Sequence, residues 1–146
     1  MLSKALRKKP AKILQADSLT SIPWLIHGFS VRSGGFSKVY GGKNLNLGFT
    51  REDSRRAVEQ NRAAFLRQLG AVRKGRALPL ITARQVHSDL IHCVSEIPRA
   101  ALTGDGLITQ PPGLRLAILT ADCLPVILRD PMRHVVGVFL AGVRGS

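Results

Sequence analysis

Two short apolar runs in the last third of the chain form its most regular hydrophobic pattern. Leu114–Leu119 and Leu124–Leu128 are rich in Ile, Leu and Val and are too short for helices, so each predicts a buried strand. Between them, Ala121–Cys123 brings a carboxylate and a thiol, and Pro125 interrupts strand pairing because it lacks a backbone N–H. The pattern therefore places two reactive groups at a break between strands, where a side chain can face a cleft.

The clearest helix is expected between Ser54 and Leu69. Its apolar positions recur on one face, at Val58, Phe65, Leu66 and Leu69. Asp53 or Ser54 can cap its first turn, and Gly70 is a natural stop. Arginines cover its other faces, which is typical of a solvated surface and is also compatible with a nucleic-acid-binding helix.

Shorter apolar segments predict further strands. They lie near Lys12–Ala16, Ile22–Ser30, Leu78–Ala83, Leu90–Val94, Asp105–Thr109 and His134–Leu140. Ala71–Ala77 is expected to be a basic loop. Together the elements predict an α+β fold of mixed, largely antiparallel sheet layers with helices packed outside. The length indicates a single domain over residues 13–146, preceded by a basic mobile arm over residues 1–12.

The net charge of +13 comes from 22 Lys and Arg against 9 Asp and Glu. Such a charge attracts polyanions without specificity, and it equally suits a small anion such as phosphate. No apolar run approaches the ~18 residues of a membrane span, and the N-terminal segment lacks the pattern of a signal peptide. Cys93 and Cys123 make no disulfide framework. We therefore expect no membrane partner and a cytoplasmic location.

Several polar residues are candidates for chemistry, each with a plainer alternative. Cys123 is a metal ligand or nucleophile if it faces a cleft, and an inert core residue if it is buried. His87 is a site residue or an ordinary hydrogen-bonded turn histidine. Arg32 stands beside paired glycines and can hold an anion, although a simple Gly-Gly turn explains the glycines. Asn44 is a site residue or serves its own loop.

The segment Thr120-Ala-Asp-Cys-Leu-Pro-Val126 resembles the central motif of the multicopper polyphenol oxidoreductases. This laccase-like family is now regarded as zinc-dependent purine nucleoside phosphorylases and adenosine deaminases. Other segments match the family in its own order: His27–Ser37, Asn44–Gly48, Glu59–Arg62, Gln85–His87, Asp105–Thr109 and Ala141–Gly145. The resemblance covers about Ile22 to Ser146, and it implies the N-terminal part of the laccase-like fold.

The resemblance also implies a site and its cofactor. The family's metal ligands correspond to His87, Cys123 and a third position that is Leu140 here, and leucine has no lone pair to bind a metal. Zinc is the implied ion, with copper in the older view of the family. Asp122 would orient a ligand. Arg32, Asn44 and Arg144 would meet substrate or phosphate. The implied substrates are phosphate and adenosine, inosine or methylthioadenosine, with deamination of adenosine as a second activity.

Three other interpretations stay open. Leu140 and the absence of the family's C-terminal part favour an inactive, truncated or degenerate relative. The charge favours a basic nucleic-acid-binding module, although aromatic residues are only 5% of the chain and provide no stacking platform. A sheet without its covering layer would expose an apolar face, so a partner chain or self-association is expected to cover it.

Overall fold

The computed structural model describes residues 12–142 and divides the chain into two compact units, Met1–Leu78 and Pro79–Ser146. Each unit combines short strands with turns, and the sheets are mixed and mostly antiparallel, so the predicted α+β class is confirmed. The expected arm lies outside the described residues except for Lys12, and the single-domain boundary stays a prediction. No helix within residues 12–142 is long and apolar enough to cross a membrane.

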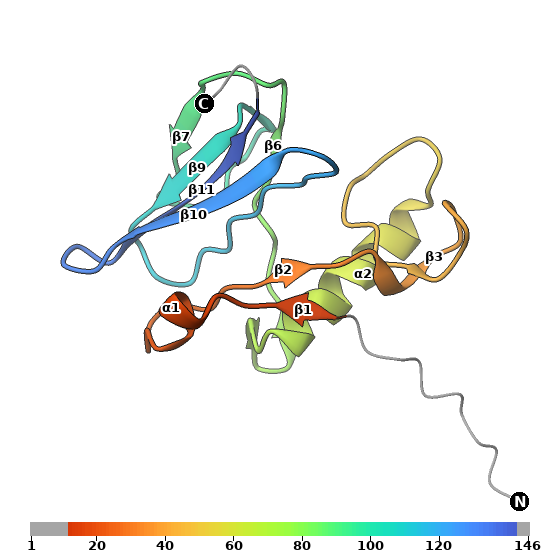
Figure 1. Ribbon diagram of the computed structural model, residues 1–146, viewed down its shortest axis with the longest axis horizontal. Helices are drawn as coiled ribbons and strands as arrows, with labels where there is room; N and C mark the ends of the chain where they lie inside the picture. Colours follow the sequence, from red (N-terminus) through yellow and green to blue (C-terminus); the bar gives the residue numbers. More distant parts are fainter. Residues whose placement is uncertain (1–11, 143–146) are drawn as a thin grey trace, which may run out of the picture. The chain divides into compact units, whose positions relative to one another are not determined.

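The first unit is built around one long helix (Figure 1). Its elements are β1 (Ile13–Leu14), α1 (Asp17–Thr20), β2 (Phe29–Ser30), β3 (Ser33–Ser37), α2 (Arg55–Gln68), β4 (Val72–Arg73) and β5 (Arg76–Ala77). β1 pairs with β2 and β4 pairs with β5, both antiparallel. α2 packs against β3 and β5.

The predicted helix is confirmed as α2. The Ser54 side chain caps it by accepting a hydrogen bond from the Ala57 N–H at 3.2 Å. Gly70, with φ +73°, follows its C-terminus in a conformation that favours glycine. The buried face packs Phe65 against Leu45, with Ile13, Leu47 and Leu69 around them. The amphipathic stripe therefore forms the apolar core of the first unit.

A fully buried Asn61 on α2 joins three segments of the first unit. Its amide nitrogen donates to Ser37 Oγ and to the Asn46 carbonyl, both at 2.8 Å, and its Oδ1 accepts the Phe36 N–H at 2.7 Å. Gly35 lies where an added Cβ would be 2.0 Å from the Asn44 carbonyl oxygen. Glycine at this position therefore lets β3 and the loop at Asn44 come together beside Asn61.

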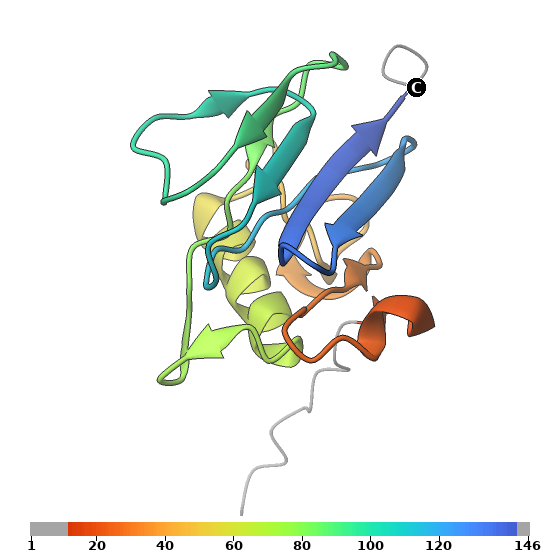
Figure 2. The same ribbon diagram turned by 90° about the vertical axis from the view of Figure 1, so that its left-hand side faces the viewer.

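The second unit contains the main sheet, whose strands lie side by side in Figure 2. Its strands are β6 (Ala83–Arg84), β7 (Ile91–Cys93), β8 (Leu102–Thr103), β9 (Gly106–Thr109), β10 (Leu124–Asp130) and β11 (Val135–Ala141). Four of them form a sheet in the order β10-β11-β9-β7, with β7 parallel to β9 and the other pairs antiparallel. β6 and β8 form a short parallel pair. Leu107, on β9, is fully buried in the core of this unit.

The expected strand at Leu114–Leu119 is wrong. Only Leu116 forms an isolated bridge, with Ile81. Both backbone groups of Leu119 bond the Gln85 side chain instead of a neighbouring strand. Because the Gln85 side chain bonds both the N–H and the C=O of Leu119, neither group is available for pairing with a neighbouring strand. The apolar pattern of the sequence does not reveal such a contact.

Two further expectations need correction. Within Ile22–Ser30 only Phe29 and Ser30 are in a strand, because Leu25 turns back to bond the Ile22 carbonyl. The expected loop Ala71–Ala77 contains the β4–β5 hairpin. Lys74 and Gly75, both with positive φ, supply the two-residue turn that suits such a hairpin.

Candidate metal centre

The structure brings His87 and Cys123 together in the second unit. His87 lies in the loop after β6, and Cys123 lies directly before β10, 36 positions later. The Nδ1 atom of His87 is 3.9 Å from the Sγ atom of Cys123. Cys123 is partly exposed and His87 is exposed, so the pair is open to solvent. A thiol in this position is available for chemistry, unlike a buried core cysteine.

The end of β11 lies beside this pair. A Cβ added to Gly142 would be 3.5 Å from Cys123 Sγ and 3.6 Å from His87 Nδ1. Glycine therefore leaves open the space next to both atoms. Leu140 is two residues earlier and shares the strand face of position 142, since side chains alternate along a strand. Its side chain is buried and supplies only hydrocarbon to that face.

The donor atoms of the pair fit a single metal ion. Zinc–sulfur and zinc–nitrogen bonds of about 2.3 and 2.0–2.1 Å at a tetrahedral angle place the two donors about 3.5 Å apart. The observed 3.9 Å is close to that separation. Within residues 12–142, no group of three or more His, Cys, Asp and Glu side chains could hold a metal. The described chain thus offers two ligands of suitable chemistry.

His87 owes its position to Asp105. The Asp105 carboxylate is buried and accepts hydrogen bonds from the N–H groups of Val86, His87 and Ser88 and from Ser88 Oγ. Burial alone would raise the pKa of Asp105, but these hydrogen bonds outweigh it and hold the pKa below its usual value. Asp105 is therefore a stable anion under the loop that carries His87.

Cys123 lies in a turn with its own internal bond. The Thr120 hydroxyl donates to the Cys123 carbonyl. Gln85, two residues before His87, bonds the backbone of Leu119 in both directions, at 2.6 and 2.8 Å. The loops of His87 and Cys123 are thus linked by a side chain that touches neither reactive atom.

The remaining predicted site residues are placed as follows. Asp122 is exposed in the turn before Cys123, and Arg144 lies outside the described residues. Arg32 and Asn44 meet in the first unit, where Arg32 Nε donates to Asn44 Oδ1 at 3.1 Å and the guanidinium also donates to the Tyr40 carbonyl. Asn44 is buried and donates to two backbone carbonyls of the same loop. The ligand-orienting role of Asp122 and the substrate-binding roles of Arg32, Asn44 and Arg144 stay predictions.

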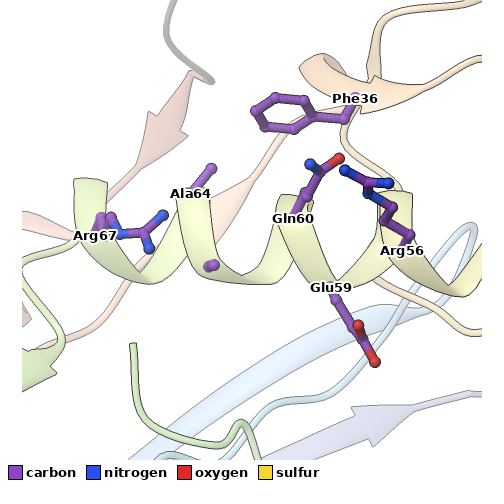
Figure 3. A pocket seen from close by; sticks show the side chains of 7 residues that line it. Phe36, Arg56, Glu59, Gln60, Ala64 and Arg67 are labelled. Atoms are coloured by element: carbon purple, nitrogen blue, oxygen red, sulfur yellow. The ribbon is translucent and has the colours of Figure 1, made fainter. Parts of the chain in front are cut away.

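A shallow hollow of about 390 Å³ lies on α2 in the first unit (Figure 3). It is lined by Phe36, Arg56, Glu59, Gln60, Ala63, Ala64 and Arg67. None of these is a predicted site residue. Two arginines and one glutamate give its lining a net positive charge, and it contains no thiol or imidazole.

Sequence reasoning missed three residues that shape the candidate site: Gln85, Asp105 and Gly142. Gln85 and Asp105 lie in segments that resemble the family, but their positions in the sequence do not reveal the contacts they make across 34 and 18 residues. Gly142 has no side chain to attract attention. All three act through backbone geometry, which a residue pattern does not show.

Comparisons with known proteins identify the family. Residues 26–146 match the family model described as "Multi-copper polyphenol oxidoreductase laccase". The chain belongs to this family, as the resemblance implied.

Two curated relatives carry an enzyme name. "Purine nucleoside phosphorylase" of Deinococcus radiodurans is 38% identical over 135 residues, which are 92% of this chain and 48% of the relative. "Purine nucleoside phosphorylase ORF3" of Streptomyces griseus is 38% identical over 124 residues, which are 80% of this chain and 47% of the relative. The chain therefore spans about half the length of these relatives.

A solved structure supports the fold. The crystal structure of Bacillus licheniformis hypothetical protein YfiH aligns with a TM-score of 0.67 and 32% sequence identity. The alignment covers 81% of this chain and 46% of that protein.

Proposed function

We propose that the chain is part of a purine nucleoside phosphorylase that binds one zinc ion through His87 and Cys123. The observation that carries the proposal is the 3.9 Å separation between His87 Nδ1 and Cys123 Sγ, beside the open space at Gly142. The names of the curated relatives support the reaction class. The proposed substrates are phosphate and adenosine, inosine or methylthioadenosine.

The reaction replaces one bond at the ribose. The C1′–N9 bond breaks, a bond forms between C1′ and a phosphate oxygen, and the free base takes up a proton. Deamination of adenosine, the proposed second activity, consumes water at C6 and releases ammonia. When bound, zinc supplies a Lewis acid that brings the pKa of a water molecule near 7. Cys123 would bind as the thiolate and His87 as the neutral imidazole.

Other residues take supporting roles in this proposal. Asp122 would orient a ligand, and Arg32, Asn44 and Arg144 would bind substrate or phosphate. A planar guanidinium offers five donors. The Arg32 guanidinium already donates to Asn44 Oδ1 and to the Tyr40 carbonyl, so a bound phosphate would share the guanidinium N–H groups with this loop. Basic side chains neutralise the charge of the attacking phosphate.

The test uses the full chain with zinc, adenosine and phosphate. Release of adenine and ribose 1-phosphate is measured by chromatography, with and without phosphate. We expect phosphate-dependent release that Cys123→Ser and His87→Ala each lower at least about a hundredfold, as removal of a metal ligand should. Measurable phosphate-dependent release by the unsubstituted chain that is unchanged in both variants contradicts the assignment of the site.

The second candidate is an inactive relative that retains the pair without catalysis. Buried Leu140 at the third family position favours it. The same experiment separates the two, because an inactive relative releases no adenine above the level of the Cys123→Ser variant.

Proposals about location and partners accompany this function. Cys93 and Cys123 are both free, which suits the reducing cytoplasm. β10 is an edge strand that exposes Leu124 and Leu128, so a partner chain or a second copy is proposed to cover it. Nucleic acid would bind only through general charge.

A further inference from the structure

A buried carboxylate fixes the loop that carries His87. The four hydrogen bonds to Asp105 measure 3.2 Å from Val86 N, 3.1 Å from His87 N, 2.7 Å from Ser88 N and 2.9 Å from Ser88 Oγ. Asp105 is only 4% exposed. Three successive N–H groups that point at one anion form a backbone nest, which is a favourable anion site. Here the anion is part of the same chain.

The nest explains an unusual backbone conformation. His87 has φ +58°, in the left-handed region that non-glycine residues seldom adopt. The bonds to a charged acceptor offset this strain, since charge-assisted hydrogen bonds are stronger than neutral ones. The position of the His87 ring therefore depends on Asp105, although no bond joins Asp105 to the ring.

A second contact fixes the partner loop. Gln85 Nε2 donates to the Leu119 carbonyl at 2.6 Å, and Gln85 Oε1 accepts the Leu119 N–H at 2.8 Å. Leu119 precedes Cys123 by four residues. Asp105 also reaches β11, because its carbonyl accepts the Leu140 N–H at 2.8 Å, two residues before Gly142. Asp105 and Gln85 thus connect the three segments around the pair: the His87 loop, the loop that leads to Cys123, and the end of β11.

We propose that Asp105 and Gln85 are positioning residues that set the His87–Cys123 separation and thereby the metal affinity of the pair. The proposal rests on the proposed function in one respect, namely that the pair binds a metal ion. Asp105 and Gln85 act through the backbone, and neither side chain touches the sulfur or the ring nitrogen.

The first variant is Asp105→Asn, with Asp130→Asn as its matched control. Asp130 also accepts turn N–H groups, from Met132 at 2.8 Å and Arg133 at 3.0 Å, and it lies in the same unit. It stands at the far end of β10, about 20 Å along the strand from Leu124. Both substitutions replace an acceptor oxygen by an NH₂ group, and only one of them faces the His87 loop.

The second variant is Gln85→Glu, which keeps the acceptor for Leu119 N–H and places a carboxylate oxygen against the Leu119 carbonyl. Gln110→Glu is its control, because Gln110 also donates its amide to a carbonyl, that of Arg133 at 3.3 Å. Ser88→Ala removes the hydroxyl bond to Asp105 and the bond that the hydroxyl accepts from the Leu90 N–H at 3.3 Å, and it keeps the backbone nest. It extends the test to a milder change in case Asp105→Asn does not fold.

Two measurements on the full chain decide the proposal. Amide hydrogen exchange without metal should quicken about tenfold or more at Val86, His87 and Ser88 in Asp105→Asn, and remain unchanged there in Asp130→Asn. Cobalt(II), titrated as a spectroscopic substitute for zinc, should give a thiolate-to-cobalt absorption band that Cys123→Ser abolishes. Its affinity should fall about tenfold in Asp105→Asn and in Gln85→Glu, and in neither control. Ser88→Ala should show a smaller change in the same direction.

The outcomes separate this proposal from the function. Equal cobalt affinity in each variant and its control overturns the positioning role, and so does exchange at the three amides that Asp105→Asn leaves unchanged. A chain that gives no thiolate-to-cobalt band contradicts the proposed function itself. In that case, faster exchange in Asp105→Asn still supports the conclusion that Asp105 fixes the His87 loop. It overturns the proposal that Asp105 sets the metal affinity of the pair.

Discussion

Single polar residues organise the first unit. Asn61 has no exposed surface and joins Phe36, Ser37 and Asn46 through its one side-chain amide. The sequence marks it only as part of a segment, Glu59–Arg62, that resembles the family. Its interior position follows from the helical period of α2, but its partners come from β3 and the loop at Asn46, 15 to 25 residues away. Local pattern alone therefore could not identify the contacts.

Removal of the Asn61 amide should destabilise the first unit. Asn61→Ala removes the hydrogen bonds that the Asn61 amide makes with the Phe36 N–H, Ser37 Oγ and the Asn46 carbonyl, and the loss of a buried hydrogen bond costs roughly 1–3 kcal/mol. We expect the free energy of unfolding in urea to fall by about 2–4 kcal/mol. Gln60→Ala, at the exposed neighbouring position, is the control. Equal stability of the two variants would show that the amide does not join the segments.

Asp53 gives the first unit a pH dependence. A hydrogen bond from Ser37, then one from Asn46, lower the pKa of Asp53, and the Ser54 N–H adds a further bond. A lowered carboxyl pKa contributes stability above the unfolded pKa of about 3.9, and this stability is lost as the pH falls through the lower folded value. The urea midpoint should therefore drop on acidification below about pH 4. This drop should be smaller in Asp53→Asn than in Glu52→Gln, and equal slopes would contradict the assignment.

At the scale of elements, apolar patterns predicted α2, β7, β9, β10 and β11 close to their observed bounds. Of these, α2, β9 and β11 contribute buried residues to the core of their own unit, whereas β7 and β10 contain partly exposed and exposed residues only. The apolar patterns predicted strands wrongly where a side chain or a turn bonds the backbone groups that strand pairing would use, as at Leu119 and within Ile22–Ser30. The β4–β5 hairpin was missed because its strands are two residues long and basic.

The end of β11 offers a direct test of the missing third ligand. In Leu140→His, an imidazole would share the strand face of Gly142, next to the pair. We expect zinc affinity, measured by competition with a chromophoric chelator, to rise more than about tenfold, because even outer-shell changes cause effects of that size. Val136→His, on the same face four residues earlier, is the control. If both variants bind zinc equally, position 140 does not face the site.

At the scale of the molecule, charge is divided unevenly between the units. Residues 12–78 contain 12 Lys and Arg against 4 Asp and Glu, whereas residues 79–146 contain 6 against 5. The excess of positive charge is therefore in the first unit, and the candidate metal pair is in the second. Composition gave the total charge, but only the division into units shows where it lies.

General binding of polyanions should depend on the first unit. The hollow on α2 includes Arg56 and Arg67 (Figure 3). Arg56→Gln with Arg67→Gln should weaken binding of single-stranded DNA and reduce the slope of log affinity against log salt by about 1.4, for two contacts. Arg115→Gln with Arg129→Gln makes the same charge change in the second unit and should have less effect. Equal losses in both double variants would mean that binding follows net charge alone.

The sequence predicted those residues of the candidate site whose side chains can bind a metal. Cys123 and His87 stand out as a thiol and an imidazole in segments that resemble the family, and the structure brings them together. The supports at Gln85 and Asp105 could not be predicted because they act on backbone groups of other segments.

Zinc K-edge X-ray absorption on the full chain, loaded with one equivalent of zinc, tests the shared metal ion most directly. A zinc ion shared by His87 and Cys123 should have one sulfur neighbour at about 2.3 Å and at least one nitrogen at about 2.0–2.1 Å. Cys123→Ser should lose the sulfur signal, and His87→Ala should keep the sulfur and lose the histidine scattering. A spectrum with only nitrogen and oxygen neighbours, or a chain that retains no zinc, would contradict the account.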